Sequence, residues 1–130
     1  AISDNKKIQN VILCSGKIYY ELAEEREKLK NDKTAILRLE QIYPFPMSQL
    51  ANILKGFTNF KNLIWVQEEP KNMGAYQHLY FKISEMVVKE GFKGVQFHYV
   101  GRGEKASPAT GSLYRHKGEQ AEILKNAFQF

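Results

Sequence analysis

The run Asn62–Val66, which reads N-L-I-W-V, decides the fold class. Its apolar side chains follow one another without polar alternation, which is typical of a strand buried on both faces of a parallel sheet. Three further runs have the same character, at Ile8–Leu13, Thr34–Leu39 and Val95–Val100. Together they predict four strands of a mostly parallel sheet.

Helical patterns follow each of these runs. Ile18, Leu22 and Leu29 mark one apolar face, and Glu24 and Lys28 form an i,i+4 pair on the opposite face. Similar stripes predict helices over roughly 46–56, 74–89 and 114–128. A β-α-β-α-β-α-β-α order implies helices on both faces of the sheet. We therefore expect one α/β domain over residues 1–130, a three-layer α/β/α sandwich with a mostly parallel sheet.

Composition narrows the classes of protein. The chain has 130 residues and a formal net charge of +5, but its charges are interspersed, which favours an ordinary solvated surface over a nucleic-acid interface. Its single cysteine, Cys14, excludes an intrachain disulfide and is expected to be a buried thiol rather than a nucleophile. No apolar run approaches the roughly 20 residues of a membrane span, and no signal peptide is visible.

Two glycine motifs resemble phosphate-binding loops but lack essential parts. Gly101–Ala106 matches G-x-G-x-x-A, yet Ser107 and Pro108 follow where a dinucleotide site needs a helix. Ser15-Gly16-Lys17 lacks the first glycine of a P-loop and carries Ile18 at the hydroxyl position. We expect Gly16 to serve the turn from strand to helix.

Polar residues cluster where the third and fourth strands are expected to end, the edge where open α/β sheets meet ligands and neighbours. Adjacent side chains of a strand point in opposite directions, so Glu68 and Glu69 are not a catalytic dyad. Arg102 could bind a carboxylate or phosphate, or form a structural ion pair with Glu68, Glu69 or another domain. The candidate interface or effector residues are Glu68, Glu69, Asn72, Gly74, Arg102, Lys105, Ser107 and His116. Neither a catalytic residue nor a metal site is expected, and His78 and His98 are interpreted as structural.

Four segments together resemble the C-terminal domain of 2-oxoglutarate dehydrogenase E1 components. Leu13–Lys17 reads L-C-S-G-K, and Ile36–Pro46 reads I-L-R-L-E-Q-I-Y-P-F-P. Trp65–Tyr76 reads W-V-Q-E-E-P-K-N-M-G-A-Y, and Tyr99–Ser112 reads Y-V-G-R-G-E-K-A-S-P-A-T-G-S. The resemblance covers nearly the whole chain, and it implies a transketolase C-terminal-like fold.

The resemblance also implies a function for a larger protein. Such E1 chains are homodimeric, use thiamine diphosphate and Mg²⁺, and pass a succinyl group to the lipoyl domain of an E2 succinyltransferase. The G-D-G motif that holds this cofactor is absent from the sequence, so we expect upstream domains to bind it. This domain would then be inactive alone and would support structure, dimerisation or regulation. The location would be cytoplasmic in a bacterium and the mitochondrial matrix in a eukaryote.

Two departures from the family pattern bear on the expected site. The arginine loop of the family runs G-R-P-A-S-A-S-P-A, whereas positions 103 to 105 here are Gly, Glu and Lys. The aromatic residue of its G-A-W motif is Tyr76. Some members bind an acyl-CoA or adenine nucleotide effector near this domain, and Lys105 would strengthen or Glu104 weaken such binding. The alternatives are a related 2-oxoadipate dehydrogenase, a free-standing anion- or nucleotide-binding module, and a basic nucleic-acid-binding domain.

Overall fold

A computed structural model describes residues 5–40, 42, 44–70, 74–102 and 113–130. Three of the candidate site residues, Asn72, Lys105 and Ser107, lie outside the described residues. The backbone of His116 is described as part of a helix, but its side chain is outside the described part.

Strands and helices alternate along the described chain, as the sequence predicts. After a 3-10 turn, η1 at Asn5–Lys7, the elements are β1 Asn10–Cys14, α1 Ile18–Leu29, β2 Thr34–Arg38, α2 Met47–Lys55, β3 Asn62–Pro70, α3 Tyr76–Lys89, β4 Gln96–Arg102 and α4 Leu113–Ala127. The first strand begins two residues later than expected, and the last two strands run further. The extension of β3 beyond Val66 to Pro70 is the largest difference.

The four strands form one parallel sheet in the order β2-β1-β3-β4. Because β1 pairs with both β2 and β3, the connection from β2 to β3 crosses over it. The chain therefore adds strands in one direction before α2 and in the other after it. The junction of β1 and β3 is the topological switch point of the sheet.

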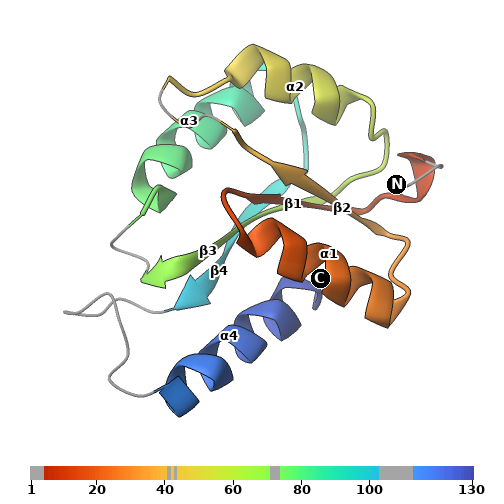
Figure 1. The fold of residues 1–130 in the computed structure, drawn as a ribbon. Coiled ribbons are helices and arrows are strands. Elements are labelled where there is room, and N and C mark those ends of the chain that lie inside the picture. Colours follow the sequence, from red (N-terminus) through yellow and green to blue (C-terminus); the bar gives the residue numbers. More distant parts are fainter. Residues whose placement is uncertain (1–4, 41, 43, 71–73, 103–112) are drawn as a thin grey trace.

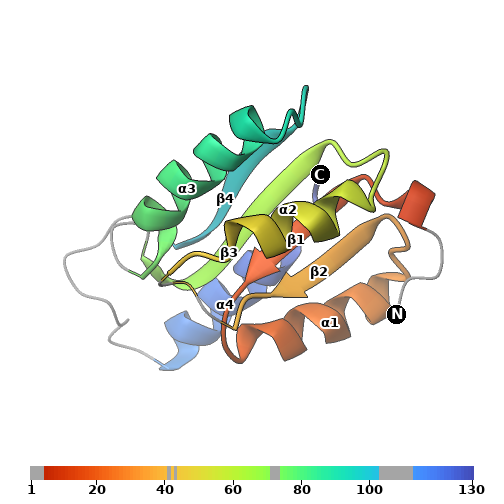
Figure 2. The same cartoon turned by 90° about the horizontal axis from the view of Figure 1, so that it is seen from above.

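Helices cover both faces of the sheet, with α2 and α3 on one side and α1 and α4 on the other (Figures 1 and 2). The central strand β3 sends Leu63 and Trp65 into the core beneath α2 and α3, and Ile64 and Val66 into the core beneath α1 and α4. All four are buried, which confirms that the N-L-I-W-V run is buried on both faces. The predicted three-layer α/β/α sandwich is confirmed.

Cys14 lies in the core under α1, at the end of β1. It is fully buried, and loss of hydration raises the pKa of its thiol to about 12. The thiolate, which is the reactive form, is therefore scarce at neutral pH. The prediction of a buried thiol is confirmed, as is the exposed ion pair between Glu24 and Lys28 on α1.

Two positions on α3 test the packing of the core. Ile83 is fully buried, whereas 83% of Val88 is exposed five residues further along the same helix. We predict that Ile83→Ala lowers the free energy of unfolding by about 2–5 kcal/mol, because it removes buried methyl groups and leaves a cavity. The matched change Val88→Ala should alter it by less than about 0.5 kcal/mol. Urea titrations followed by circular dichroism measure both, and equal losses would contradict the packing described.

Candidate functional site

The C-terminal ends of β3 and β4 lie side by side and form the centre of the candidate site. Their pairing is regular up to Val66 and Val100 and then shifts, so that Pro70 aligns with Arg102. The shift places more residues on β3 than on β4, which is the geometry of a β-bulge. Polar side chains from β3, β4, α1 and α4 meet around this bulge.

Gln67 holds the bulge from within. Its side-chain oxygen accepts a 2.8 Å hydrogen bond from the indole N–H of Trp65. Its amide nitrogen donates to the main-chain oxygens of Glu69, at 3.1 Å, and Pro70, at 2.9 Å. Only 3% of Gln67 is exposed, so these bonds replace those that the amide would make with water. A glutamine directly after a continuous buried run was the signal for this role, and sequence reasoning missed it.

Arg102 ties β4 to its neighbours. Its Nη1 donates a 2.5 Å hydrogen bond to the main-chain oxygen of Glu68, and its Nε lies 2.9 Å from Oε2 of Glu119 on α4. The Nε contact is an ion pair by distance, although the N–H is not well directed at that oxygen. The side chain of Arg102 is only 7% exposed. Among the described residues its carboxylate partner is therefore Glu119, and not the side chain of Glu68 or Glu69 that we had considered.

Gln120 links three elements beside that ion pair. Its amide nitrogen donates to Glu21 on α1 at 2.5 Å and to Glu68 on β3 at 3.0 Å. Since carboxylates only accept hydrogen bonds, both bonds require the NH₂ group of Gln120 to face them. The amide thus holds two carboxylates together and joins α1, β3 and α4.

Glu68 and Glu69 diverge, as expected for adjacent residues of a strand. Glu68 contacts Gln120 on the α4 side, whereas the carboxylate of Glu69 lies beside Gly74, just before α3. Gly74 has a φ of +70°, and a Cβ there would lie 3.0 Å from Oε2 of Glu69. Glycine is therefore favoured at position 74 both by its backbone conformation and by the closeness of Glu69.

Tyr99 and Gly101 close the β4 side of the bulge. The hydroxyl of Tyr99 donates a 2.5 Å hydrogen bond to the main-chain oxygen of Arg102. Partial burial raises the pKa of this hydroxyl to about 12, so it remains a donor at neutral pH. A Cβ on Gly101 would lie 2.6 Å from both the main-chain oxygen of Gln67 and the Tyr99 hydroxyl. Gly101 therefore permits the close approach of β4 to the bulge.

A crevice of about 580 Å³ opens at the switch point, beside this cluster. The turn Ser15-Gly16-Lys17 lines one side, and Trp65, Gln67, Glu68, Glu69, Gly74, Ala75 and others line the rest. Gly16 has a φ of +80°, which confirms its role in the turn from strand to helix. The crevice contains Lys17 and two glutamates, so its wall carries charges of both signs.

The histidines of the described residues serve the sheet and its helices. Nε2 of His98 lies 2.8 Å from the side-chain oxygen of Asn62, and the ring packs against Phe130. Burial lowers the pKa of His98, which favours the neutral ring. In the part of the chain that the structure describes, no three His, Cys, Asp or Glu side chains could hold a metal ion together. None of the described helices has the length and hydropathy needed to cross a bilayer.

The close approach at Gly101 yields a prediction. Gly101→Ala should lower the free energy of unfolding by about 1–3 kcal/mol, because the new methyl group must displace main chain of β3 and the Tyr99 ring. Gly118→Ala is the matched control, because that position is in α4 with nothing within 4 Å of the added carbon. It should stabilise the protein by about 0.5–1 kcal/mol through helix propensity. Thermal melts of both variants measure the effects, and a neutral Gly101→Ala would show that the bulge yields easily.

Sequence comparisons give this geometry its family. A family model described as 2-oxoglutarate dehydrogenase C-terminal matches residues 1–128. Among curated relatives, the chain is 46% identical to a 2-oxoglutarate dehydrogenase E1 component of Rickettsia felis over 95% of its length, and 40% identical to that of Azotobacter vinelandii over 96%. It spans only 12% and 13% of the lengths of these two relatives. The chain belongs to the 2-oxoglutarate dehydrogenase C-terminal family, whose resemblance to this sequence rested on the same strand-end segments.

Proposed function

We propose that this chain is the C-terminal domain of a longer E1 component that decarboxylates 2-oxoglutarate and passes the succinyl group to the lipoyl domain of an E2 succinyltransferase. Its relatives named as E1 components are about eight times longer than the matched region, which supports a division of labour between domains. Action on 2-oxoadipate is the alternative substrate. Bacterial relatives favour a cytoplasmic location.

One observation carries the role proposed for this domain. The polar groups at the ends of β3 and β4 are bound to one another, as in the Arg102–Glu119 ion pair and the Gln67 and Gln120 hydrogen bonds. Groups so engaged form a stiff polar surface and are poorly suited to exchange protons with a substrate. The buried thiol of Cys14, with its pKa near 12, is likewise poorly suited to act as a nucleophile. We infer a scaffold that orients neighbouring domains.

Thiamine diphosphate and Mg²⁺ fit this role only as groups bound elsewhere in the longer protein. The described residues offer no cluster of metal ligands, and the sequence contains no G-D-G motif. No step of the thiamine reaction is therefore assigned to side chains of this chain. In the E1 component the cofactor supplies the carbanion chemistry, and this domain would contribute orientation and contacts.

We further propose that the strand-end surface faces upstream E1 domains or the second protomer. Glu69 and Lys17 line the crevice and remain accessible there, unlike Arg102. Charges of both signs around a hollow suit a polar domain interface. Asn72, Lys105, Ser107 and His116 stay candidates for the same surface, or for an acyl-CoA or adenine nucleotide effector.

The first test of this function compares the domain with the longer protein. The 130-residue chain, supplied with thiamine diphosphate and Mg²⁺, should show no ferricyanide-linked oxidation of 2-oxoglutarate or 2-oxoadipate. The E1 chain that contains it should oxidise 2-oxoglutarate faster than 2-oxoadipate. Turnover by the domain alone would refute the scaffold role, and a preference for 2-oxoadipate would select the alternative substrate.

The second test addresses the interface. Glu69→Ala in the longer protein should lower activity or dimer stability several-fold, because it removes an accessible charge from the strand-end surface while sparing the internal hydrogen bonds of the bulge. Glu24→Ala on the exposed face of α1 is the control, because it removes a charge from a solvated ion pair. Activity assays and sedimentation measure both variants. Equal behaviour of the two would place the interface elsewhere.

A further inference from the structure

The outer edge of β2 is a strand edge that no described residue pairs with. Leu39, directly after β2, donates its main-chain N–H to Cys14 of β1 at 2.8 Å. Because successive residues of a strand direct their main-chain groups to alternate sides, Ile36 and Arg38 direct theirs away from β1. A row of main-chain donors and acceptors therefore faces outward along β2, which is the usual template for an added strand.

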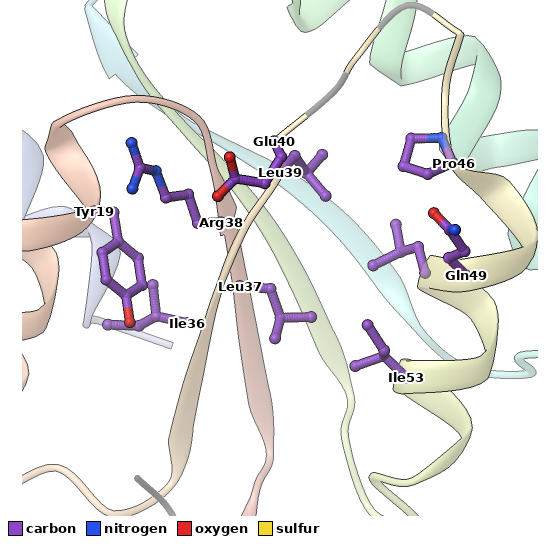
Figure 3. Close-up of a pocket in the computed structure, with 10 residues that line it drawn as sticks. Tyr19, Ile36, Leu37, Arg38, Leu39, Glu40, Pro46, Gln49 and Ile53 are labelled. Carbon is purple, nitrogen blue, oxygen red and sulfur yellow. The ribbon is translucent and has the colours of Figure 1, made fainter.

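Apolar side chains flank this edge above and below. A cavity of about 530 Å³ lies along it and is lined by Tyr19 of α1, Ile36, Leu37, Arg38, Leu39 and Glu40 of β2 and its extension, and Pro46, Gln49, Leu50 and Ile53 near or on α2. Figure 3 shows Tyr19 and Ile36 on one side of the β2 ribbon and Leu37, Gln49 and Ile53 on the other. The side chains of an added strand would alternate between these two walls.

The apolar groups along β2 are less buried than those of the inner strands. Ile36 and Leu37 are only partly buried, and Ile53 is 51% exposed, whereas the corresponding residues of β1 and β3 are fully buried. Natural sheet edges are usually protected by a charge, a proline or a bulge. The one charge on β2, Arg38, lies over the ring of Tyr20 on α1 and donates to its hydroxyl at 3.2 Å. The edge is therefore shaped for cover and lacks its own protection.

The chain direction at η1 indicates where the cover comes from. Lys7 lies 3.9 Å from Asp32, and Gln9 donates its N–H to the main-chain oxygen of Lys33 at 2.8 Å. Both partners immediately precede β2, so the polypeptide N-terminal to Asn5 approaches the sheet beside the beginning of this edge strand. A preceding segment that ends there must run antiparallel to β2 if it pairs with it. Such a strand needs only a short connection, unlike a parallel one.

We propose that an extended segment of the same polypeptide, N-terminal to Asn5, docks antiparallel on β2 and becomes a fifth strand of the sheet. The inference rests on the proposal that this chain is part of a longer E1 component. β2 has five residues, so a segment of about five or six residues spans it at roughly 3.3 Å per residue. Its apolar side chains would fill the cavity between Tyr19 and Ile53.

The experiment compares the 130-residue chain with a chain extended by about 20 natural residues at its N-terminus, a length that allows for one strand and its turn. Hydrogen exchange by NMR should show the Ile36 and Arg38 amides protected at least about tenfold more in the extended chain. The Leu37 and Leu39 amides, which point to β1, serve as internal controls. Equal exchange of Ile36 and Arg38 in both chains would overturn the proposal. Protection in the short chain that rises with protein concentration would assign the edge to a second copy and also overturn it.

Two substitutions at one position provide an independent measurement. Arg38→Pro removes an outward N–H, and Arg38→Ala removes the same side chain but keeps it. In the extended chain Arg38→Pro should melt several degrees below Arg38→Ala, and in the short chain the two should agree more closely. If only the extended chain folds, its Pro and Ala variants still decide, because an undocked edge predicts no gap between them. Neither readout involves decarboxylation, so failure here is distinct from failure of the proposed E1 function.

Discussion

Gln67 satisfies a constraint on which the strand-end surface depends. β3 is buried on both faces, so any residue that continues it into the layer between α3 and α4 must bring its own hydrogen-bond partners. The amide of Gln67 accepts from Trp65 and donates to Glu69 and Pro70, which closes the bulge on itself. Once the bulge is closed, the main-chain oxygen of Glu68 can accept from Arg102, and Gly101 can approach the main chain of Gln67.

The buried Arg102–Glu119 pair has a specific consequence for assembly. An ion pair so little exposed gains attraction in a low dielectric but costs much of that gain in desolvation. Its net contribution to stability is therefore small, while removal of either partner leaves a costly unpaired charge. Such a pair chiefly specifies where α4 lies against β4. With Gln120 bonded to Glu21 and Glu68, it holds α4 in one position relative to α1 and β3.

Periodicity was sufficient to predict the layers of this fold but not its polar contacts. Continuous apolar runs such as Asn62–Val66 identify inner strands because both of their faces must be covered. The candidate residues Glu68, Glu69, Gly74 and Arg102 do gather at one edge, since parallel strands end together. The partner of Arg102 could not be predicted, because Glu119 follows it by 17 positions and is brought back only by the packing of α4. Gln67 was missed because a single polar residue in a buried run has no periodic signature.

The two surfaces through which this domain would meet other chain segments differ in their physics. At the strand ends the polar groups are already bonded to one another, so a neighbour gains little from replacing those bonds and must use accessible charges such as Glu69. Along β2 the main-chain groups of Ile36 and Arg38 face outward beside an apolar cavity, so a neighbour gains both hydrogen bonds and buried area. The first surface suits contacts that form and adjust between folded domains. The second suits a segment that joins the sheet during folding and stays, which makes the edge of β2 part of the core that this domain completes with the polypeptide before it.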